Sequence, residues 1–118
     1  MITEGLAKLK ILVPKTVSRQ MGVFYNPVME MNRTLSILLL KALGRKKMQI
    51  CDPLAGSGIR GIRFLLELPK NMISQVDLND HEKKSVSLMK QHFSLNKIKS
   101  KISIHTKDAT MFLLDGKG

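Results

Sequence analysis

The sequence predicts an α/β fold built on a parallel sheet, in the order strand, helix, strand, helix, strand, helix. Three short segments are predicted as strands: residues 48–51 form an apolar run typical of a buried strand, residues 74–78 are less apolar, and residues 101–106 alternate around Ile102 and Ile104. Each precedes a segment in which apolar residues recur at helical spacing. This alternation indicates a βαβαβ half-sheet whose parallel strands are joined by right-handed crossovers.

Length and composition limit the chain to one small domain. It has 118 residues, of which 43% are hydrophobic, enough for a packed core and too many for a disordered segment. The 20 Lys and Arg exceed the 9 Asp and Glu by 11 charges. Such an excess favours a polyanionic partner, nucleic acid above all, and the alternative is ordinary solubilising surface charge.

Membrane insertion and secretion find no support in the sequence. No apolar run approaches the roughly 20 residues that a spanning helix needs. The first residues lack the basic start and apolar core of a secretory signal, and one Cys cannot form an internal disulfide. We therefore expect an intracellular protein, cytoplasmic or, in a eukaryote, nuclear.

Residues 1–45 are expected to form an N-terminal arm and helix. A strand or extended arm is predicted at residues 9–13, ended by Pro14, and residues 24–27 are predicted to turn into a helix over 28–43. Its expected apolar face consists of Leu35, Leu39 and Leu43, and its expected end is Gly44.

Residues 46–118 are expected to form the βαβαβ half-sheet. The first helix is predicted over 59–68, ended by Pro69, the second over 81–96, and a third begins at 109. Cys51, at the end of the first strand, is expected in the core. The alternating Lys97, Lys99 and Lys101 precede the third strand and fit either a contact with RNA or a solvated loop.

The segment between the first strand and its helix has the features of a ligand-binding turn. It reads Asp52-Pro-Leu-Ala-Gly56-Ser57-Gly58-Ile-Arg60-Gly61. Glycines such as Gly56 and Gly58 permit positive φ and close approach of the backbone to a ligand, and the following helix offers free N–H groups. This placement between strand and helix carries more weight than a glycine pattern alone.

Two acidic residues at strand ends complete the candidate site. Asp80 follows Gly61 by 19 positions, close to the roughly 20 at which a carboxylate meets a ribose in dinucleotide-type folds. The alternative for Asp80 is a helix cap, and both roles can coexist. Asp108-Ala109 follows the third strand, where an adenine would lie, with a helix cap again the alternative.

The nature of Asp52 favours a cationic ligand over a dinucleotide. The loop lacks the GxGxxG spacing, and a carboxylate at its start would repel a pyrophosphate. It would attract the sulfonium and amino groups of S-adenosylmethionine.

The chain resembles the tRNA (guanine-26-N2) dimethyltransferases. The resemblance rests on four blocks: Val23-Phe-Tyr-Asn-Pro-Val-Met29 with Asn32-Arg33, Asp52-Pro-Leu-Ala-Gly-Ser-Gly-Ile-Arg-Gly-Ile-Arg63, Leu78-Asn-Asp80 and Asp108-Ala109. It implies the N-terminal half of a Rossmann-like class I methyltransferase sheet. It further implies transfer of methyl groups from S-adenosyl-L-methionine to N2 of guanine 26 of tRNA, giving N2,N2-dimethylguanosine. By the same resemblance, the positions that bind the methyl donor are Arg33, Arg63, Asp80, Asp108 and Ala109.

The chain departs from that family in two respects. Thr34 stands where the family has an acidic residue, which puts an orienting partner of Arg33 in question. The family's catalytic Asp-Pro-Phe-Gly segment would come after Gly118. We therefore expect these residues alone to be inactive, poorly soluble or self-associating, and to pair with a missing C-terminal portion. Two rival hypotheses are a DNA amino-methyltransferase and a non-catalytic RNA-binding remnant or split-enzyme subunit.

Overall fold

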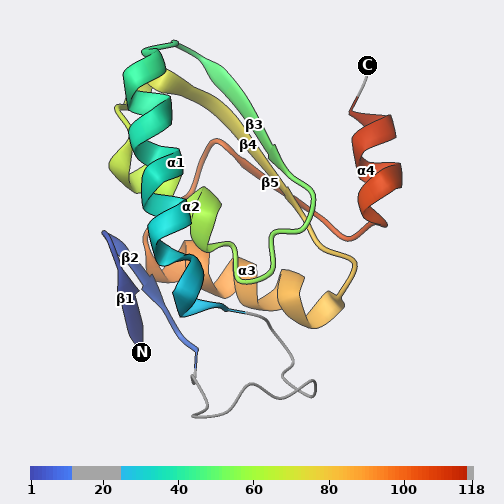
Figure 1. Ribbon diagram of the computed structural model, residues 1–118. Helices are drawn as coiled ribbons and strands as arrows, with labels where there is room; N and C mark the ends of the chain where they lie inside the picture. Colours follow the sequence, from blue (N-terminus) through green and yellow to red (C-terminus); the bar gives the residue numbers. More distant parts are fainter. Residues whose placement is uncertain (12–24, 117–118) are drawn as a thin grey trace.

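Three parallel strands in the order β3-β4-β5 form the central sheet of the computed structural model (Figure 1). The structure describes residues 1–11 and 25–116. The strands are β3 (Met48–Asp52), β4 (Ile73–Asn79) and β5 (Ile102–His105). Ile50 lies opposite Val76, which lies opposite Ile102, so apolar side chains align across one face of the sheet. The predicted parallel α/β fold is confirmed.

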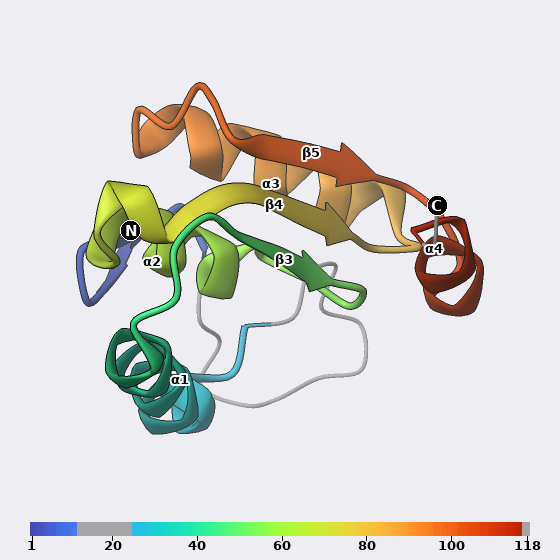
Figure 2. The same ribbon diagram turned by 90° about the horizontal axis from the view of Figure 1, so that it is seen from above.

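Helices α2 (Ile59–Glu67) and α3 (Lys83–Leu95) make the crossovers between these strands. Both crossovers are right-handed and step across the sheet in the same direction, from β3 to β4 and from β4 to β5, so both helices pack on the same face of the sheet. The packing there is close, because a Cβ atom added to Gly61 of α2 would lie 2.8 Å from Leu78 of β4. A 3-10 turn, η2 (Lys70–Met72), follows α2, and α4 (Ala109–Asp115) follows β5 at the carboxyl end of the sheet (Figure 2).

The opposite face of the sheet is polar. Gln75 donates hydrogen bonds to Asp77 at 3.1 Å and to Ser103 at 2.8 Å across this face. Cys51 alternates to the same side of β3 and is exposed, so its predicted core position is wrong. The reason is register: Ile50 packs against the core, and the next residue must point the other way.

The N-terminal part forms a hairpin and a helix. Strands β1 (Ile2–Glu4) and β2 (Ala7–Leu9) pair antiparallel and contact α2 and α3. The strand predicted at 9–13 overlaps this hairpin only at Leu9; residues 10 and 11 are not in a strand, and residues 12–14 lie outside the described residues. A 3-10 turn, η1 (Pro27–Met29), leads into α1 (Glu30–Leu43), which ends at Gly44 with φ 62°, as predicted.

The buried face of α1 is not the predicted one. Arg33 and Ile37 are its buried residues, whereas the three predicted leucines are exposed. Polar contacts of Arg33 with the hairpin orient the helix, and apolar periodicity does not reveal such contacts. Within the described ranges, no helix is both long and apolar enough to cross a bilayer.

Candidate functional site

The glycine loop between β3 and α2 adopts the backbone that the sequence predicts. Gly56 and Gly58 have φ values of 55° and 80°. Both lie in the left-handed region, where a side chain is sterically costly. Gly58 is also confined by space, because an added Cβ would lie 2.9 Å from Cγ of Met89. The tight turn therefore depends on glycine at these positions.

A cavity of about 320 Å³ opens beside this loop. It lies among the start of α1, the end of β3 and the start of α2, at the carboxyl end of the sheet. Ligands of open α/β sheets bind at this end. The lining residues are Tyr25, Asn26, Met29, Arg33, Asp52, Leu54, Ala55, Gly56, Ser57, Ile59 and Arg60.

Asp52 supplies a carboxylate to the cavity at the end of β3. Burial raises its pKa, and the nearby charge of Asp80 adds to this effect. The backbone N–H of Leu54, 3.3 Å from Oδ1, and the charge of Arg60 lower the pKa and so oppose the shift. A partly desolvated carboxylate of this kind gains most from a cationic ligand.

Asp80 is bonded directly to the glycine loop. Its Oδ2 accepts a hydrogen bond from the N–H of Gly56 at 2.9 Å, and its Oδ1 accepts one from the N–H of Glu82 at 3.0 Å. The second bond joins residues i and i+2 before α3, whose N-cap is Glu82, so the helix-cap role given as the alternative for Asp80 is wrong. The first bond ties the end of β4 to the loop. Asp80 is buried and is not one of the residues that line the cavity.

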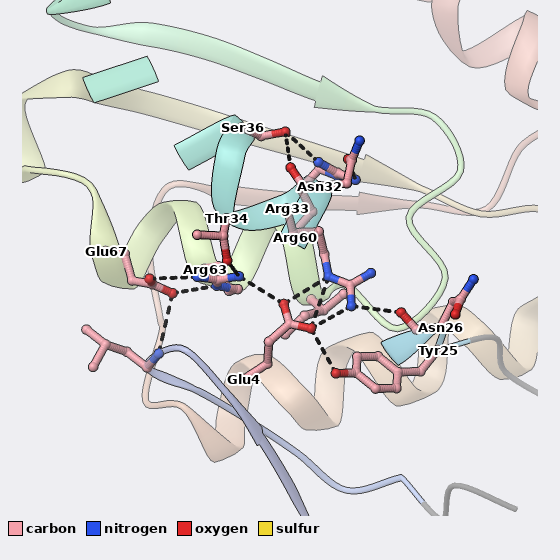
Figure 3. Close-up of polar contacts among 12 residues, drawn as sticks. Glu4, Tyr25, Asn26, Asn32, Arg33, Thr34, Ser36, Arg60, Arg63 and Glu67 are labelled. Carbon is pink, nitrogen blue, oxygen red and sulfur yellow. Dashed lines mark hydrogen bonds and ion pairs between the residues drawn. The ribbon is translucent and has the colours of Figure 1, made fainter. Parts of the chain in front are cut away.

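Arg33 lies in the cavity wall and is held by a carboxylate from β1 (Figure 3). Its Nε donates to Oε2 of Glu4 at 2.9 Å, and its Nη2 donates to the carbonyl of Asn26 at 3.0 Å. Burial alone would lower the pKa of Arg33, but the hydrogen bonds and charge of Glu4 raise it overall. Glu4 thus provides an orienting partner where the sequence has Thr34 instead of an acidic residue.

Tyr25 completes this cluster. Its hydroxyl donates to Glu4 at 2.8 Å, and the centroid of its ring lies 5.1 Å from Cζ of Arg33. Burial and the bond to Glu4 raise the pKa of Tyr25 to about 12. The Tyr-Asn-Pro block therefore shapes the wall of the cavity through Tyr25 and Asn26, while Phe24 lies outside the described residues.

Arg63 faces away from the cavity in this structure. Its guanidinium donates to Glu4 at 3.1 Å, to Thr34 at 3.0 Å and to Glu67 at 2.7 Å (Figure 3). It is not among the lining residues, whereas Arg60, one helical turn earlier, is. Arg60 donates to Ser36 and Asn32 and so joins α2 to α1. The donor-binding role expected for Arg63 stays a prediction.

Asp108 and Ala109 lie at the start of α4. Oδ2 of Asp108 accepts hydrogen bonds from the N–H groups of Thr110 at 3.0 Å and Met111 at 3.3 Å, so Asp108 is an N-cap. The exposed cap and the half-buried Ala109 follow β5 at the same end of the sheet as Asp80.

Two buried polar residues of the site escaped the sequence reasoning. Glu4 is 1% exposed and His92 is fully buried. Nδ1 of His92 lies 2.8 Å from the carbonyl of Ser57 in the glycine loop, and Nε2 accepts the N–H of Lys10 at 3.1 Å. Their partners are 21 to 82 positions away in the sequence, so no local pattern indicates them.

Known proteins share both the sequence and the fold. The family model for N2,N2-dimethylguanosine tRNA methyltransferase matches residues 5–118. The tRNA (guanine(26)-N(2)/guanine(27)-N(2))-dimethyltransferase of Aquifex aeolicus is 44% identical over 118 residues, covering 95% of this chain and 29% of that protein. A tRNA (guanine(26)-N(2))-dimethyltransferase of Pyrobaculum aerophilum is 43% identical over 91 residues, covering 77% and 24%.

Solved structures agree with this relationship. Trm1 from Pyrococcus horikoshii, determined in complex with S-adenosyl-L-methionine, superposes with a TM-score of 0.77 at 34% identity, covering 97% of this chain and 32% of that protein. Trm5b from Pyrococcus abyssi superposes with a TM-score of 0.69 at 18% identity, which shows a shared fold.

The parallel sheet and its glycine loop define an α/β domain of the methyltransferase type. The chain belongs to the N2,N2-dimethylguanosine tRNA methyltransferase family. The resemblance expected from the sequence is confirmed. The chain spans about three tenths of the length of the relatives it matches.

Proposed function

We propose that this chain binds S-adenosyl-L-methionine and forms the donor-binding part of a tRNA (guanine-26-N2) dimethyltransferase. The observation that carries the proposal is the bond between Asp80 and Gly56, which places a carboxylate against a glycine loop beside a cavity that contains Asp52 and Arg33. Family membership and the donor-bound relative support the same ligand.

The polar groups present match the parts of this ligand. Asp52 offers a partly desolvated carboxylate to the amino group, and Arg33 and Arg60 offer guanidinium donors to the methionine carboxylate. Asp80 keeps acceptor capacity for ribose hydroxyls, since each carboxylate oxygen accepts more than one hydrogen bond. Asp108 and Ala109 border the position expected for adenine. The donor supplies an electrophilic methyl group on a sulfonium.

The substrate in this proposal is tRNA, and the location is intracellular. The relatives are named as tRNA dimethyltransferases, and the net charge of +11 suits a polyanion. We expect no methyl transfer by these 118 residues alone. An exocyclic amine is a poor nucleophile that must be positioned and must lose a proton, and no Asp-Pro-Phe-Gly segment occurs in the sequence.

The test is calorimetric titration of the purified chain with S-adenosylhomocysteine, which cannot transfer a methyl group. We expect saturable binding that weakens at least ~10-fold in Asp80→Ala, because the carboxylate is lost from the ribose position. Asp80→Asn retains one acceptor and is expected to be intermediate. Asp115→Asn, an exposed carboxylate on α4, is the matched control and should bind as the parent chain does.

Circular dichroism of each variant shows whether it is folded. If the folded parent chain binds no S-adenosylhomocysteine, or if Asp80→Ala binds it unchanged, the proposed donor site is refuted.

A further inference from the structure

Seven basic residues gather in the three turns at the amino end of the sheet, opposite the proposed donor site. We call this surface the basic end; it consists of Arg45, Lys46, Lys47, Lys70, Lys97, Lys99 and Lys101. The segments 44–51, 68–76 and 94–104, which contain these residues, hold none of the chain's nine acidic residues. The positive charge is therefore concentrated on one surface.

Hydrogen bonds hold the three turns side by side. The N–H of Lys47 donates to the carbonyl of Asn71 at 2.9 Å, and Nζ of Lys101 donates to the carbonyl of Lys70 at 2.8 Å. Figure 2 shows the amino ends of the three strands together, with α4 at the far end. A recess of about 330 Å³ lies between the second and third turns and includes Lys70, Lys97, Lys99 and Lys101.

The backbone of this surface is unusual at three of its lysines. Lys47, Lys97 and Lys101 have φ values of 55°, 59° and 66°, and they are the non-glycine residues with positive φ in the part of the chain that the structure describes. Lysine is sterically disfavoured there, and glycine or asparagine would fit better. Strained positions of this kind cluster at functional surfaces. At the basic end, all three carry a cation.

We propose that the basic end binds the phosphate backbone of RNA. Lysines neutralise phosphates as point charges and release counterions, which gives affinity without sequence selectivity. Base stacking is not expected to contribute, since the three segments contain no aromatic residue. The seven residues of β4 place this surface about 20 Å from the carboxyl end, at 3.3 Å per residue. One part of an RNA molecule can thus bind here while another part of the same molecule reaches the donor site.

The choice of RNA as the polyanion rests on the proposed function. The surface itself goes beyond that function, because it lies at the end of the sheet remote from the glycine loop and shares no residue with the cavity there.

The test compares two variants that remove the same charge. The first is Lys47→Gly with Lys97→Gly and Lys101→Gly, which removes three cations and relieves the positive-φ backbone, so its fold is preserved. The control is Lys83→Gln with Lys84→Gln and Lys90→Gln, three exposed lysines of α3. Binding of a fluorescein-labelled 20-base-pair RNA duplex is followed by anisotropy between 50 and 300 mM salt.

We expect the glycine variant to bind at least ~10-fold more weakly at 100 mM salt, with the slope of log K against log salt reduced by about 2 to 3. The control variant should keep most of the parent's affinity and slope. Equal losses in both variants would mean that only net charge matters and would overturn the proposal.

Two further measurements separate the rival outcomes. Vesicles of 4:1 phosphatidylcholine and phosphatidylserine are added in place of RNA; if the glycine variant loses vesicle binding and retains RNA binding, the partner is a membrane surface and the proposal fails. S-adenosylhomocysteine titration tests the donor site separately. Loss of RNA binding in the glycine variant with no donor binding by the parent would support the basic end and refute the proposed function.

Discussion

Glu4 and Arg33 form a buried ion pair that joins the first strand of the chain to its first helix, with Nε of Arg33 2.9 Å from Oε2 of Glu4. The same carboxylate accepts hydrogen bonds from Arg63 of α2 and from the hydroxyl of Tyr25. One side chain of a three-residue strand therefore connects the hairpin, both helices and the cavity wall.

Replacement of this carboxylate by an amide should strongly destabilise the fold. Glu4→Gln leaves Arg33 buried without its counter-ion, and Arg63 loses one of its two acidic partners and retains Glu67. We expect the free energy of unfolding in urea to fall by about 3 to 5 kcal/mol, the usual cost of breaking a buried pair by removing one partner. Glu82→Gln, on an exposed carboxylate, is the control and should change stability by less than about 0.5 kcal/mol. A loss below about 1 kcal/mol in Glu4→Gln would show that the pair is not a structural requirement.

Acid should weaken the fold through the same cluster. Burial alone would raise the pKa of Glu4, but its bonds to Arg33, Tyr25 and Arg63 lower it below 4.5; the bonds of Arg63 likewise lower the pKa of Glu67. A carboxyl whose pKa is lower in the folded state stabilises the fold above its unfolded pKa. That stability is lost as the pH falls below about 4.5 and through the folded pKa. Urea unfolding at pH 6, 4.5 and 3.5 should show the decrease.

The variant Glu4→Gln with Glu67→Gln provides the comparison for this pH dependence. Because both titrating groups are gone, its stability should change less between pH 4.5 and 3.5 than that of the parent chain. Parallel pH profiles for the two proteins would contradict the assignment.

The regular part of the fold could be predicted because its signals are local. An apolar run indicates β3, and Val86, Met89 and Phe93 repeat at helical spacing in α3 and are buried. The hairpin was missed because β1 has three residues and its inward residue, Glu4, is charged. A hydropathy pattern treats such a residue as exposed, whereas three partners from distant segments keep it buried.

In the candidate site, too, the features with local sequence signals were predictable. The glycine loop and Asp80 follow from the positions of residues relative to strand ends, and the structure shows the expected positive φ at Gly56 and Gly58. The contacts of His92 and the direction in which Arg63 points depend on packing between elements far apart in sequence. No spacing within the sequence encodes them.

Two of the left-handed glycines, Gly44 and Gly58, allow strain to be separated from crowding. An added Cβ at Gly44 meets nothing within 4 Å, whereas at Gly58 it meets Cγ of Met89 at 2.9 Å. Gly44→Ala should cost about 1 kcal/mol for the backbone alone. Gly58→Ala should cost about 1 to 3 kcal/mol more because the loop is overpacked. Both values come from urea unfolding, and the difference should shrink in a Met89→Ala background; equal costs at the two glycines would refute the crowding.

Self-association, expected from the sequence, is now expected through α1. Leu35, Leu39 and Leu43 are 56%, 61% and 53% exposed and lie on one face of this helix. Contiguous exposed apolar surface of this kind favours association with a second copy. In sedimentation velocity experiments, the sedimentation coefficient of the parent chain should increase with protein concentration. The variant Leu35→Gln with Leu39→Gln should sediment as a monomer. The control, Leu113→Gln with Leu114→Gln on α4, should still associate, and a monomeric parent chain would contradict the prediction.

His92 should be a positioning residue for the glycine loop. Since Nε2 accepts the N–H of Lys10, the proton lies on Nδ1, which donates to the carbonyl of Ser57. His92→Leu removes the partner of the buried Ser57 carbonyl and of the part-buried Lys10 N–H, and it should lower the free energy of unfolding by about 2 to 4 kcal/mol. His92→Gln keeps a donor and an acceptor and should cost less. His81→Leu, at an exposed position, is the control.

A structural role in the hairpin alone would not affect the ligand, so donor affinity is the second measurement. Because Ser57 lies between Gly56 and Gly58, a shift of its peptide unit changes the loop that contacts Asp80. S-adenosylhomocysteine should therefore bind more weakly to folded His92→Leu than to the parent chain, and His92→Gln should restore part of the affinity. Unchanged affinity in His92→Leu would limit the residue to joining α3 to Lys10 and to the glycine loop.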